Sequence, residues 1–260
     1  MKRLLAVLLV SGVATGEITL ENMRQVVSEY GPEKKVARYV PGEKVYLLFD
    51  AIGAEEKDGQ VAFILRFEAL TPKGESLGKY DGEEQKAADI FARGSIRCSV
   101  FVGLPPDAPA GTYAVNISVE DRVAGKKAET KVEFEVVAPE LTTINPRLVV
   151  DSAGENGHGP FVADGETLYY RFTVAGLKTE NGKAKLSVDL VILDGAGKEI
   201  RTVPYFVDTE VEVADGLVHV PMGIHFTGRG KYTVRGVVKD VLAGKETVCD
   251  LPVHLLAPPK

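Results

Sequence analysis

The chain has 260 residues, of which 45% are hydrophobic and 26% are charged, and its mean hydropathy is +0.00. This apolar content excludes a disordered chain and is sufficient for buried cores. The formal net charge is only −6 and no block of basic residues occurs, so the chain lacks the cationic surface that nucleic-acid binding requires.

The first 16 residues have the three parts of a secretory signal peptide. Lys2 and Arg3 form a basic tip, an apolar run follows, and the small residues from Ala14 to Gly16 suit a cleavage site. The apolar run is about half of the ~20 residues that a membrane-spanning helix needs. We therefore expect residues 1–16 to be cleaved and the mature chain, without a transmembrane segment, to be secreted or periplasmic.

The rest of the chain is a tandem repeat. The segment that begins at Asn22 aligns with the segment that begins at Asn145, a shift of 123 residues, and later glycines keep this shift. At Gly111, which aligns with Gly230, the shift has become 119. A repeat of about 120 residues is long enough for each copy to close its own core. The sequence predicts two domains, residues 17–139 and 140–260, joined by a short linker that contains proline.

Apolar residues alternate with polar residues in both copies, which is typical of half-buried β-strands. A slip of one residue would turn each apolar set toward water, so the agreement between the copies also fixes the register. In chain order, the inward-facing sets of the first copy are Val45, Leu47, Phe49 and Ala51; Phe63, Leu65, Phe67 and Ala69; Tyr113, Val115 and Val119; and Val132, Phe134 and Val136, and those of the second are Leu168, Tyr170, Phe172 and Val174; Leu186, Val188, Leu190 and Ile192; Tyr232, Val234 and Val238; and Leu251, Val253 and Leu255.

Residues that tolerate a positive φ separate these strands, as in Asp58-Gly59. Only the segment from Glu83 to Phe91 has helical character, and we expect a loop with one helical turn there. Asp121 and Asp240 occupy matched positions in Asp-x-x-x-Gly-Lys, where a carboxylate can cap the turn by accepting backbone N–H groups. Roughly seven or eight short strands in each copy predict an all-β fold of antiparallel β-sandwiches.

The segment from Asp107 to Val115, which contains Gly-Thr-Tyr, resembles the end of many bacterial immunoglobulin-like domains. In those domains a Gly-x-Tyr opens the penultimate strand, and the second copy has the same pattern from Gly230 to Tyr232. The resemblance implies two tandem immunoglobulin-like antiparallel β-sandwich domains of about 120 residues each. It also implies that Tyr113 and Tyr232 are corner tyrosines, with rings in the core and hydroxyl groups bonded to nearby backbone.

The chain departs from antibody-type domains in its cysteines and in having no Trp. Val115 and Val234 stand where the second cysteine of an inter-sheet pair would be. Cys98 and Cys249 fall at positions that do not correspond between the copies, and each shares the parity of inward-pointing neighbours. We therefore expect two buried free thiols that act as small apolar residues.

All four histidines lie in the second copy, at positions 158, 219, 225 and 254. His219 lies between Val218 and Val220, and His254 lies between Val253 and Leu255, so both are expected to face outward on different strands. No two histidines have metal-ligand spacing, and we expect no metal and no cofactor. Asp151, Ser152 and His158 lie in one stretch, but turns commonly hold such residues, and the sequence predicts no catalytic residue. Calcium binding by an acidic loop stays open.

Exposed aromatic residues are the candidates for a contact surface. Tyr46 and Tyr169 are matched between the copies and lie on the strand face opposite the inward set. They either pack under a loop or a strand edge, or form part of a contact surface. Tyr80, Tyr205 and Phe206 complete the candidate set.

These features favour a non-catalytic secreted or periplasmic protein that acts as a binding, adhesion or spacer module of the cell envelope. Its partner would be a protein or a polysaccharide of the envelope. One alternative is a carbohydrate-binding accessory protein, and another is an enzyme with a site in the second copy. Since features shared by both copies report the fold, functional features are expected where the copies differ, at residues 79–93, 154–160 and 202–215.

Overall fold

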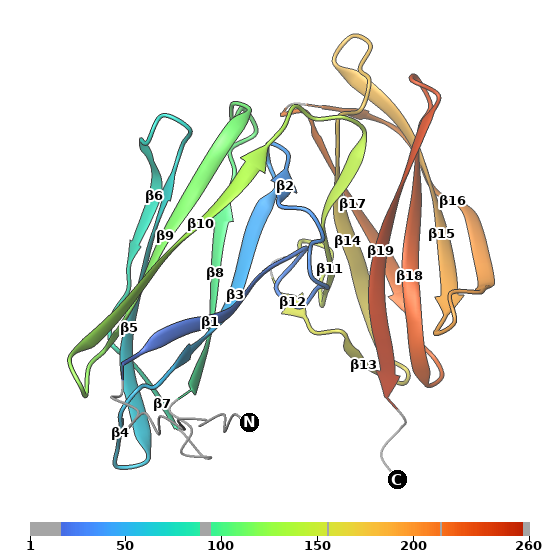
Figure 1. The fold of residues 1–260 in the computed structure, drawn as a ribbon. Coiled ribbons are helices and arrows are strands. Elements are labelled where there is room, and N and C mark those ends of the chain that lie inside the picture. Colours follow the sequence, from blue (N-terminus) through green and yellow to red (C-terminus); the bar gives the residue numbers. More distant parts are fainter. Residues whose placement is uncertain (1–16, 89–94, 155, 214, 257–260) are drawn as a thin grey trace, which may run out of the picture.

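The computed structural model describes residues 17–88, 95–154, 156–213 and 215–256. These residues form β-strands in several sheets, and none of them is helical, so the predicted all-β fold is confirmed. The described ranges accordingly contain no helix that is long and apolar enough to cross a membrane. The predicted signal peptide, residues 1–16, lies outside the described residues. Figure 1 shows the first half of the chain, in blue to green, beside the second half, in yellow to red.

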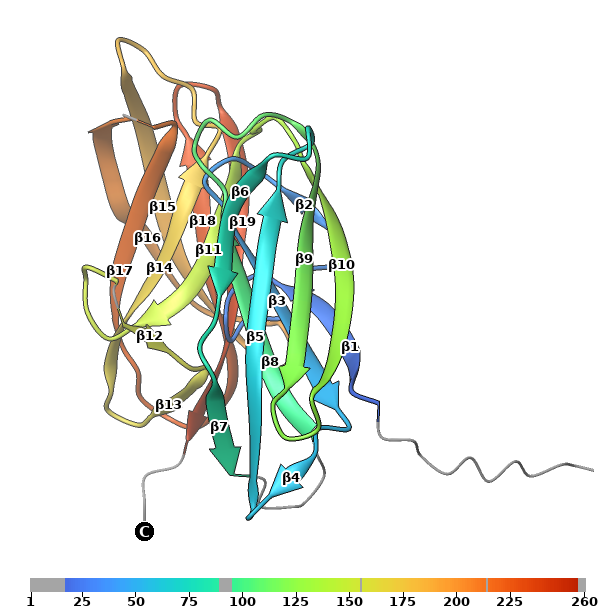
Figure 2. The ribbon, with the colours of Figure 1, turned by 90° about the vertical axis from the view of Figure 1, so that its left-hand side faces the viewer.

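The strands of the first half are, in chain order, β1 (Thr19–Val26), β2 (Arg38–Tyr39), β3 (Lys44–Ile52), β4 (Glu56–Lys57), β5 (Gln60–Leu70), β6 (Ser76–Asp81), β7 (Gln85–Ala88), β8 (Ser95–Gly103), β9 (Gly111–Asp121) and β10 (Lys126–Val136). They form two sheets. One sheet is three-stranded, in the order β1-β3-β8. In the other, β2, β10, β9 and β5 follow one another. β6 and β7 pair with the remaining side of β5, and β4 pairs with residues 60 and 61 on the side of β5 that faces β9. Figure 2 shows β6 and β7 following one another along β5.

The strands of the second half are, in chain order, β11 (Thr142–Val149), β12 (Gly157–His158), β13 (Phe161–Ala163), β14 (Thr167–Ala175), β15 (Lys183–Asp194), β16 (Glu199–Glu212), β17 (Leu217–His225), β18 (Gly230–Asp240) and β19 (Lys245–Leu256). One sheet has the order β12-β11-β14-β17 and the other the order β13-β19-β18-β15-β16. Pairing is antiparallel throughout the described strands, except that β2 runs parallel to β10 and β13 runs parallel to β19.

The strand positions reproduce the sequence repeat. β1, β3 and β5 begin at residues 19, 44 and 60, and β11, β14 and β15 begin 123 residues later, at 142, 167 and 183. β9 and β18 begin 119 residues apart, at 111 and 230. Even the bulges match: the first strand of each half shifts register at an asparagine with positive φ, Asn22 or Asn145. The two halves therefore have the same architecture.

Each half closes its own core between its two sheets. The inward sets predicted for β3 and β14 are buried, with exposed fractions of at most 1%. Alternation at a period of two produces this result, because successive side chains of a strand point to opposite faces. Cys98 and Cys249 are buried free thiols, as predicted.

The prediction of a loop with one helical turn over Glu83 to Phe91 is wrong for its central part. Residues Gln85–Ala88 form β7, which pairs with residues 60–63 of β5. The backbone of this segment therefore forms inter-strand hydrogen bonds, which outweigh the weak helical preference of its alanines. Residues 89–91 lie outside the described residues.

The corner tyrosines have the expected hydrogen bonds. The ring of Tyr113 is buried, and its hydroxyl group donates to the carbonyl oxygen of Pro109 at 3.1 Å. The Tyr232 hydroxyl donates to the carbonyl oxygen of Arg229 at 3.0 Å. Its ring is half-buried and packs against the second core.

The matched aspartates cap their turns, as predicted, and also hold a second loop. Asp121 Oδ1 accepts the N–H groups of Val123 and Ala124 at 2.8 and 3.1 Å, and its Oδ2 accepts that of Glu55 at 2.7 Å. Asp240 repeats the arrangement, because its Oδ2 accepts the N–H of Lys178 at 2.7 Å. Both carboxylates are buried, so backbone N–H groups replace the water that a charged group would otherwise require.

The two halves meet in a junction with its own apolar cluster. Val40 of the first half packs with Ile144 and Ala175 of the second. The side chain of Asn145 crosses the junction: its Oδ1 accepts the N–H of Lys44 at 2.9 Å, and its Nδ2 lies 3.5 Å from the carbonyl oxygen of Gly42. Gly42 has a φ of 82°, which favours glycine, and a Cβ atom there would lie 2.3 Å from Leu217 Cδ1, so a larger residue would also displace this leucine.

We expect Asp121→Asn to lower the free energy of unfolding by about 2 to 3 kcal/mol, since an amide would leave at least one buried N–H group without an acceptor. Urea denaturation measures this loss. Asp58→Asn is the matched control, because the second half has Asn181 at that exposed turn, and its effect should stay within about 0.5 kcal/mol. Equal stability of Asp121→Asn and the parent chain would contradict the capping role.

Asn145→Ala and Asn22→Ala should each lower the free energy of unfolding by about 1 to 2 kcal/mol, because alanine tolerates the left-handed backbone conformation poorly. Only Asn145→Ala removes the hydrogen bonds across the junction, since Asn22 donates to Asp50 within the first half. Small-angle X-ray scattering should therefore show a larger radius of gyration for Asn145→Ala alone. An equal change in both variants would mean that Asn145 does not fasten the halves.

Candidate functional site

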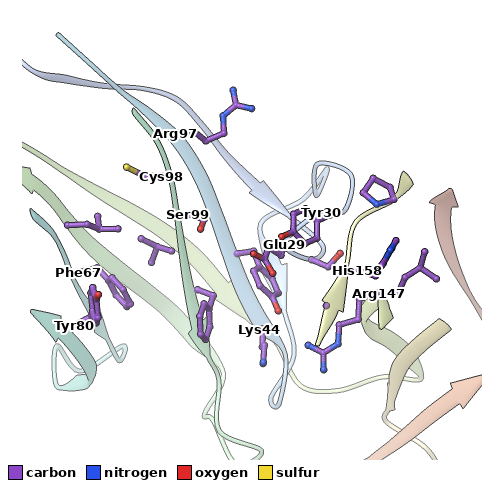
Figure 3. Close-up of a pocket in the computed structure, with 18 of the residues that line it drawn as sticks. Glu29, Tyr30, Lys44, Phe67, Tyr80, Arg97, Cys98, Ser99, Arg147 and His158 are labelled. Carbon is purple, nitrogen blue, oxygen red and sulfur yellow. The ribbon is translucent and has the colours of Figure 1, made fainter. Parts of the chain in front are cut away.

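A groove of about 670 Å³ runs along the edge strand β8 of the first half. Its walls come from β3, β5, β6 and β7 of the first half and from β11, β12 and β19 of the second. Figure 3 shows that side chains lie on both sides of β8: Phe67 and Tyr80 on one side, and Lys44, Arg147 and His158 on the other. The groove therefore has two parts separated by the edge of this strand.

The backbone of β8 is paired on one side only. Leu104 N donates to Glu43 O at 2.9 Å, and the antiparallel register then continues through Val102↔Val45 and Val100↔Leu47. Since hydrogen-bonded pairs alternate along such a ladder, the N–H and C=O groups of the intervening residues, Arg97, Ser99 and Phe101, point away from β3. Among the described strands, none pairs with that side of β8.

The inner lobe of the groove is the part between the two sheets of the first half, and it is apolar. Phe63, Leu65 and Phe67 of β5 line it, together with Val100 of β8. Tyr80 of β6 stacks on Phe67 with ring centroids 5.4 Å apart, and 42% of its surface is exposed. Phe63, Leu65 and Val100 are buried, so the first core meets solvent at this edge through the half-buried Phe67 and the exposed Tyr80.

The outer lobe is the part between the three-stranded sheet and the second half, and it is aromatic and cationic. Tyr46 and Phe101 lie with ring centroids 6.1 Å apart, and Lys44 Nζ lies 5.5 Å from the centre of the Phe101 ring. Phe101 is 58% exposed, whereas Tyr46 is 8% exposed. Arg147 and His158 complete this lobe from the second half.

Three cationic side chains lie close together at the outer lobe. Burial, and then the charges of Arg147 and Arg171, lower the pKa of Lys44 below its usual range. Arg147 donates to the carbonyl oxygen of Gly154 at 2.9 Å and Arg171 donates to that of Ala153, which are neutral acceptors. Within the described ranges, none of the three forms an ion pair with a carboxylate. Glu29 lines the same lobe, so the lobe carries more positive than negative charge.

His158 has both ring nitrogens occupied. Its Nδ1 lies 2.8 Å from the carbonyl oxygen of Gly159, and its Nε2 lies 3.3 Å from Glu166 Oε1. His219 and His225 are exposed on β17, and His254 of β19 lies against Phe161, with ring centroids 5.6 Å apart. Among the described residues no three His, Cys, Asp or Glu side chains are grouped so as to hold a metal ion.

The structure brings two of the five candidate contact residues together. Tyr46 and Tyr80 both line the groove, although Tyr46 is buried there. Tyr169 lies on β14 beside Gly223, and Tyr205 and Phe206 lie on β16. Two of the segments where the copies differ also reach the groove, through Tyr80 and Gln85 and through Gly157, His158 and Pro160.

Sequence reasoning missed Phe101, Lys44 and Arg147. Phe101 carried a usable signal, because a bulky apolar residue at an outward-facing position of an alternating strand is unexpected. Lys44 and Arg147 carried none, since they are 103 positions apart in the sequence and meet only through the packing of the two halves.

No family model matches the chain, and no curated protein matches its sequence. Among solved structures, the C-terminal domain of the Streptococcus agalactiae AgI/II polypeptide BspA is 10% identical, with a TM-score of 0.31, over 91% of this chain and 99% of that chain. Red sea bream transglutaminase is 10% identical, with a TM-score of 0.31, over 92% of this chain and 31% of that chain. The DNA glycosylase AlkC of Pseudomonas fluorescens is 16% identical, with a TM-score of 0.31, over 45% of this chain and 31% of that chain. These identities and TM-scores are too low to inform on function.

We expect both thiols of the native protein to react slowly with a disulfide reagent such as DTNB at pH 8. Burial raises the pKa of Cys98 and that of Cys249 to about 11, which leaves about a hundredfold less thiolate than at the ordinary value of 9.0. Two thiols should react rapidly after unfolding in urea. Rapid labelling of native Cys98, measured in a Cys249→Ser variant, would mean that the inner lobe opens more widely than the structure shows.

Proposed function

We propose that the chain is a non-catalytic, secreted or periplasmic protein of two immunoglobulin-like β-sandwich domains, residues 17–139 and 140–260, that binds a protein or polysaccharide of the cell envelope. The groove along β8 is the binding site in this proposal. The observation that carries it is the combination of an apolar lobe and an aromatic, cationic lobe on the two sides of one strand edge that no described strand pairs with.

The immunoglobulin-like assignment is supported by the order of the strands. A three-stranded sheet of the first, third and eighth strands faces a sheet in which β9 lies between β10 and β5. The short parallel pairing of β2 with β10 and the corner hydrogen bond of Tyr113 fit the same arrangement. The second half repeats each of these features, with β13, β19 and Tyr232.

The groove favours a binding role over a spacer role. Its volume of about 670 Å³ lies within the range of ligand sites in proteins, and its lining combines apolar, aromatic and charged side chains. A spacer needs no such surface, and an exposed core edge carries a risk of aggregation. A non-catalytic role is favoured because His158, the histidine that lines the groove, has both ring nitrogens engaged and so cannot act as a general base there.

Carbohydrate binding is the second candidate. The stack of Tyr80 on Phe67 supports it, because an exposed aromatic ring held by a second ring is a rigid surface for a sugar face. The cationic outer lobe would then favour an acidic polysaccharide.

The mature chain should bind one of two immobilised fractions of its own cell envelope, either the proteins or the protease-treated polysaccharides. Tyr80→Ala and Phe101→Ala should each weaken this binding about tenfold or more, because each removes an aromatic anchor from the groove. Biolayer interferometry measures both effects.

Tyr205→Ala is the control, since this residue is 67% exposed on β16 and is not part of the groove. If neither fraction binds, or if Tyr205→Ala is as harmful as Tyr80→Ala, the groove is not the binding site.

A further inference from the structure

We propose that the groove takes an extended polypeptide segment, which adds to the three-stranded sheet as a further strand beside β8. This inference rests on the proposed function and specifies the class of partner. The segment has apolar side chains at every second position and at least one acidic side chain between them.

The free edge of β8 supplies the backbone partners. The outward N–H and C=O groups of Arg97, Ser99 and Phe101 form a row that an extended segment can pair with, as in other examples of strand addition. In constant-type immunoglobulin sheets a fourth strand occupies the corresponding edge. The first half therefore has the place for this strand, and none of its described strands fills it.

The two lobes of the groove are the reason why the side chains of the bound segment should alternate in character. Successive side chains of a strand point to opposite faces of the sheet, so a strand beside β8 would direct one set into the inner lobe and the other into the outer lobe. The inner set would cover Phe63, Leu65 and Phe67, which requires apolar side chains. The outer set would meet Lys44 and Arg147, which favours a carboxylate.

In the second half the equivalent edge strand is β17, and a proline interrupts its free edge. Phe226 N donates to Glu166 O at 2.8 Å and the register places Arg171 opposite Pro221, so the backbone of Pro221 faces the free side of β17. Pro221 pairs with Arg171, and Ser99 pairs with Leu48. Since positions 48 and 171 correspond in the repeat, Pro221 is the structural equivalent of Ser99. Proline has no N–H to donate and is a common device for protecting an edge strand. The edge of the first half has no proline from Ser95 to Gly103.

A single segment fits the groove better than the sheet edge of a second copy of the chain. β8 lies between two walls, with Tyr80 and Gln85 on one side and Pro160 and Pro252 on the other. A lone strand can enter between these walls, whereas a sandwich edge brings a second sheet about 10 Å away that the walls would obstruct.

The test uses the mature chain and a display library of random twelve-residue peptides. Enriched peptides should alternate apolar residues with residues that include Asp or Glu. Ser99→Pro should weaken their binding at least about tenfold, whereas Pro221→Ser in the second half should leave it unchanged. Lys44→Glu should weaken the acidic peptides selectively.

A second measurement does not depend on how the variants fold. Single N-methylation along an enriched peptide should abolish binding at every second position only, because alternate amides of an added strand donate to β8. Failure to enrich any peptide, enriched peptides without alternation, equal binding to Ser99→Pro, or an N-methylation profile without a period of two would each overturn strand addition. Dimerisation of the chain that Ser99→Pro abolishes would also overturn it. If an envelope fraction still binds in a manner sensitive to Tyr80→Ala, the proposed function stands and only the class of partner is wrong.

Discussion

The groove exists because the two halves of the chain are held against each other. A short apolar cluster and the side chain of Asn145 fix the junction, and Gly42 allows the close approach of Leu217. Without this contact the wall that carries Arg147 and His158 would not face β8. Both halves thus contribute to one groove, and its outer lobe requires the two of them.

Asn145 also shows how a repeated feature acquires a new role. Both halves need a left-handed residue at the bulge of their first strand, and asparagine tolerates that conformation. In the first half the side chain bonds to Asp50 nearby, whereas in the second half it reaches the backbone of the preceding copy. The same local requirement therefore supports a long-range contact in one copy only.

The sequence was sufficient for those parts of the fold that depend on local chemistry. Alternation predicted the buried faces of β3 and β14, and the turn pattern predicted the capping roles of Asp121 and Asp240. Each aspartate also accepts a hydrogen bond from a distant loop, at Glu55 or Lys178, and this bond could not be predicted because it joins loops that are far apart in the sequence. The strand β7 was missed for the same reason, since its partner is β5 rather than a sequence neighbour. The groove forms only when both halves are packed together. The sequence could therefore indicate only that residues 79–93 and 154–160 lie near a functional feature, and not the groove itself.

In the strand-addition proposal the edge at Ser99 is open, whereas Pro221 interrupts the equivalent edge of the second half. On this proposal, one edge is open and the equivalent edge is closed, so each chain takes one added strand. A monovalent molecule ends a chain of associations, whereas one with two open edges would join partners into growing assemblies. Repeating the domain without repeating its open edge would therefore provide a second wall for the groove without a second place for strand addition.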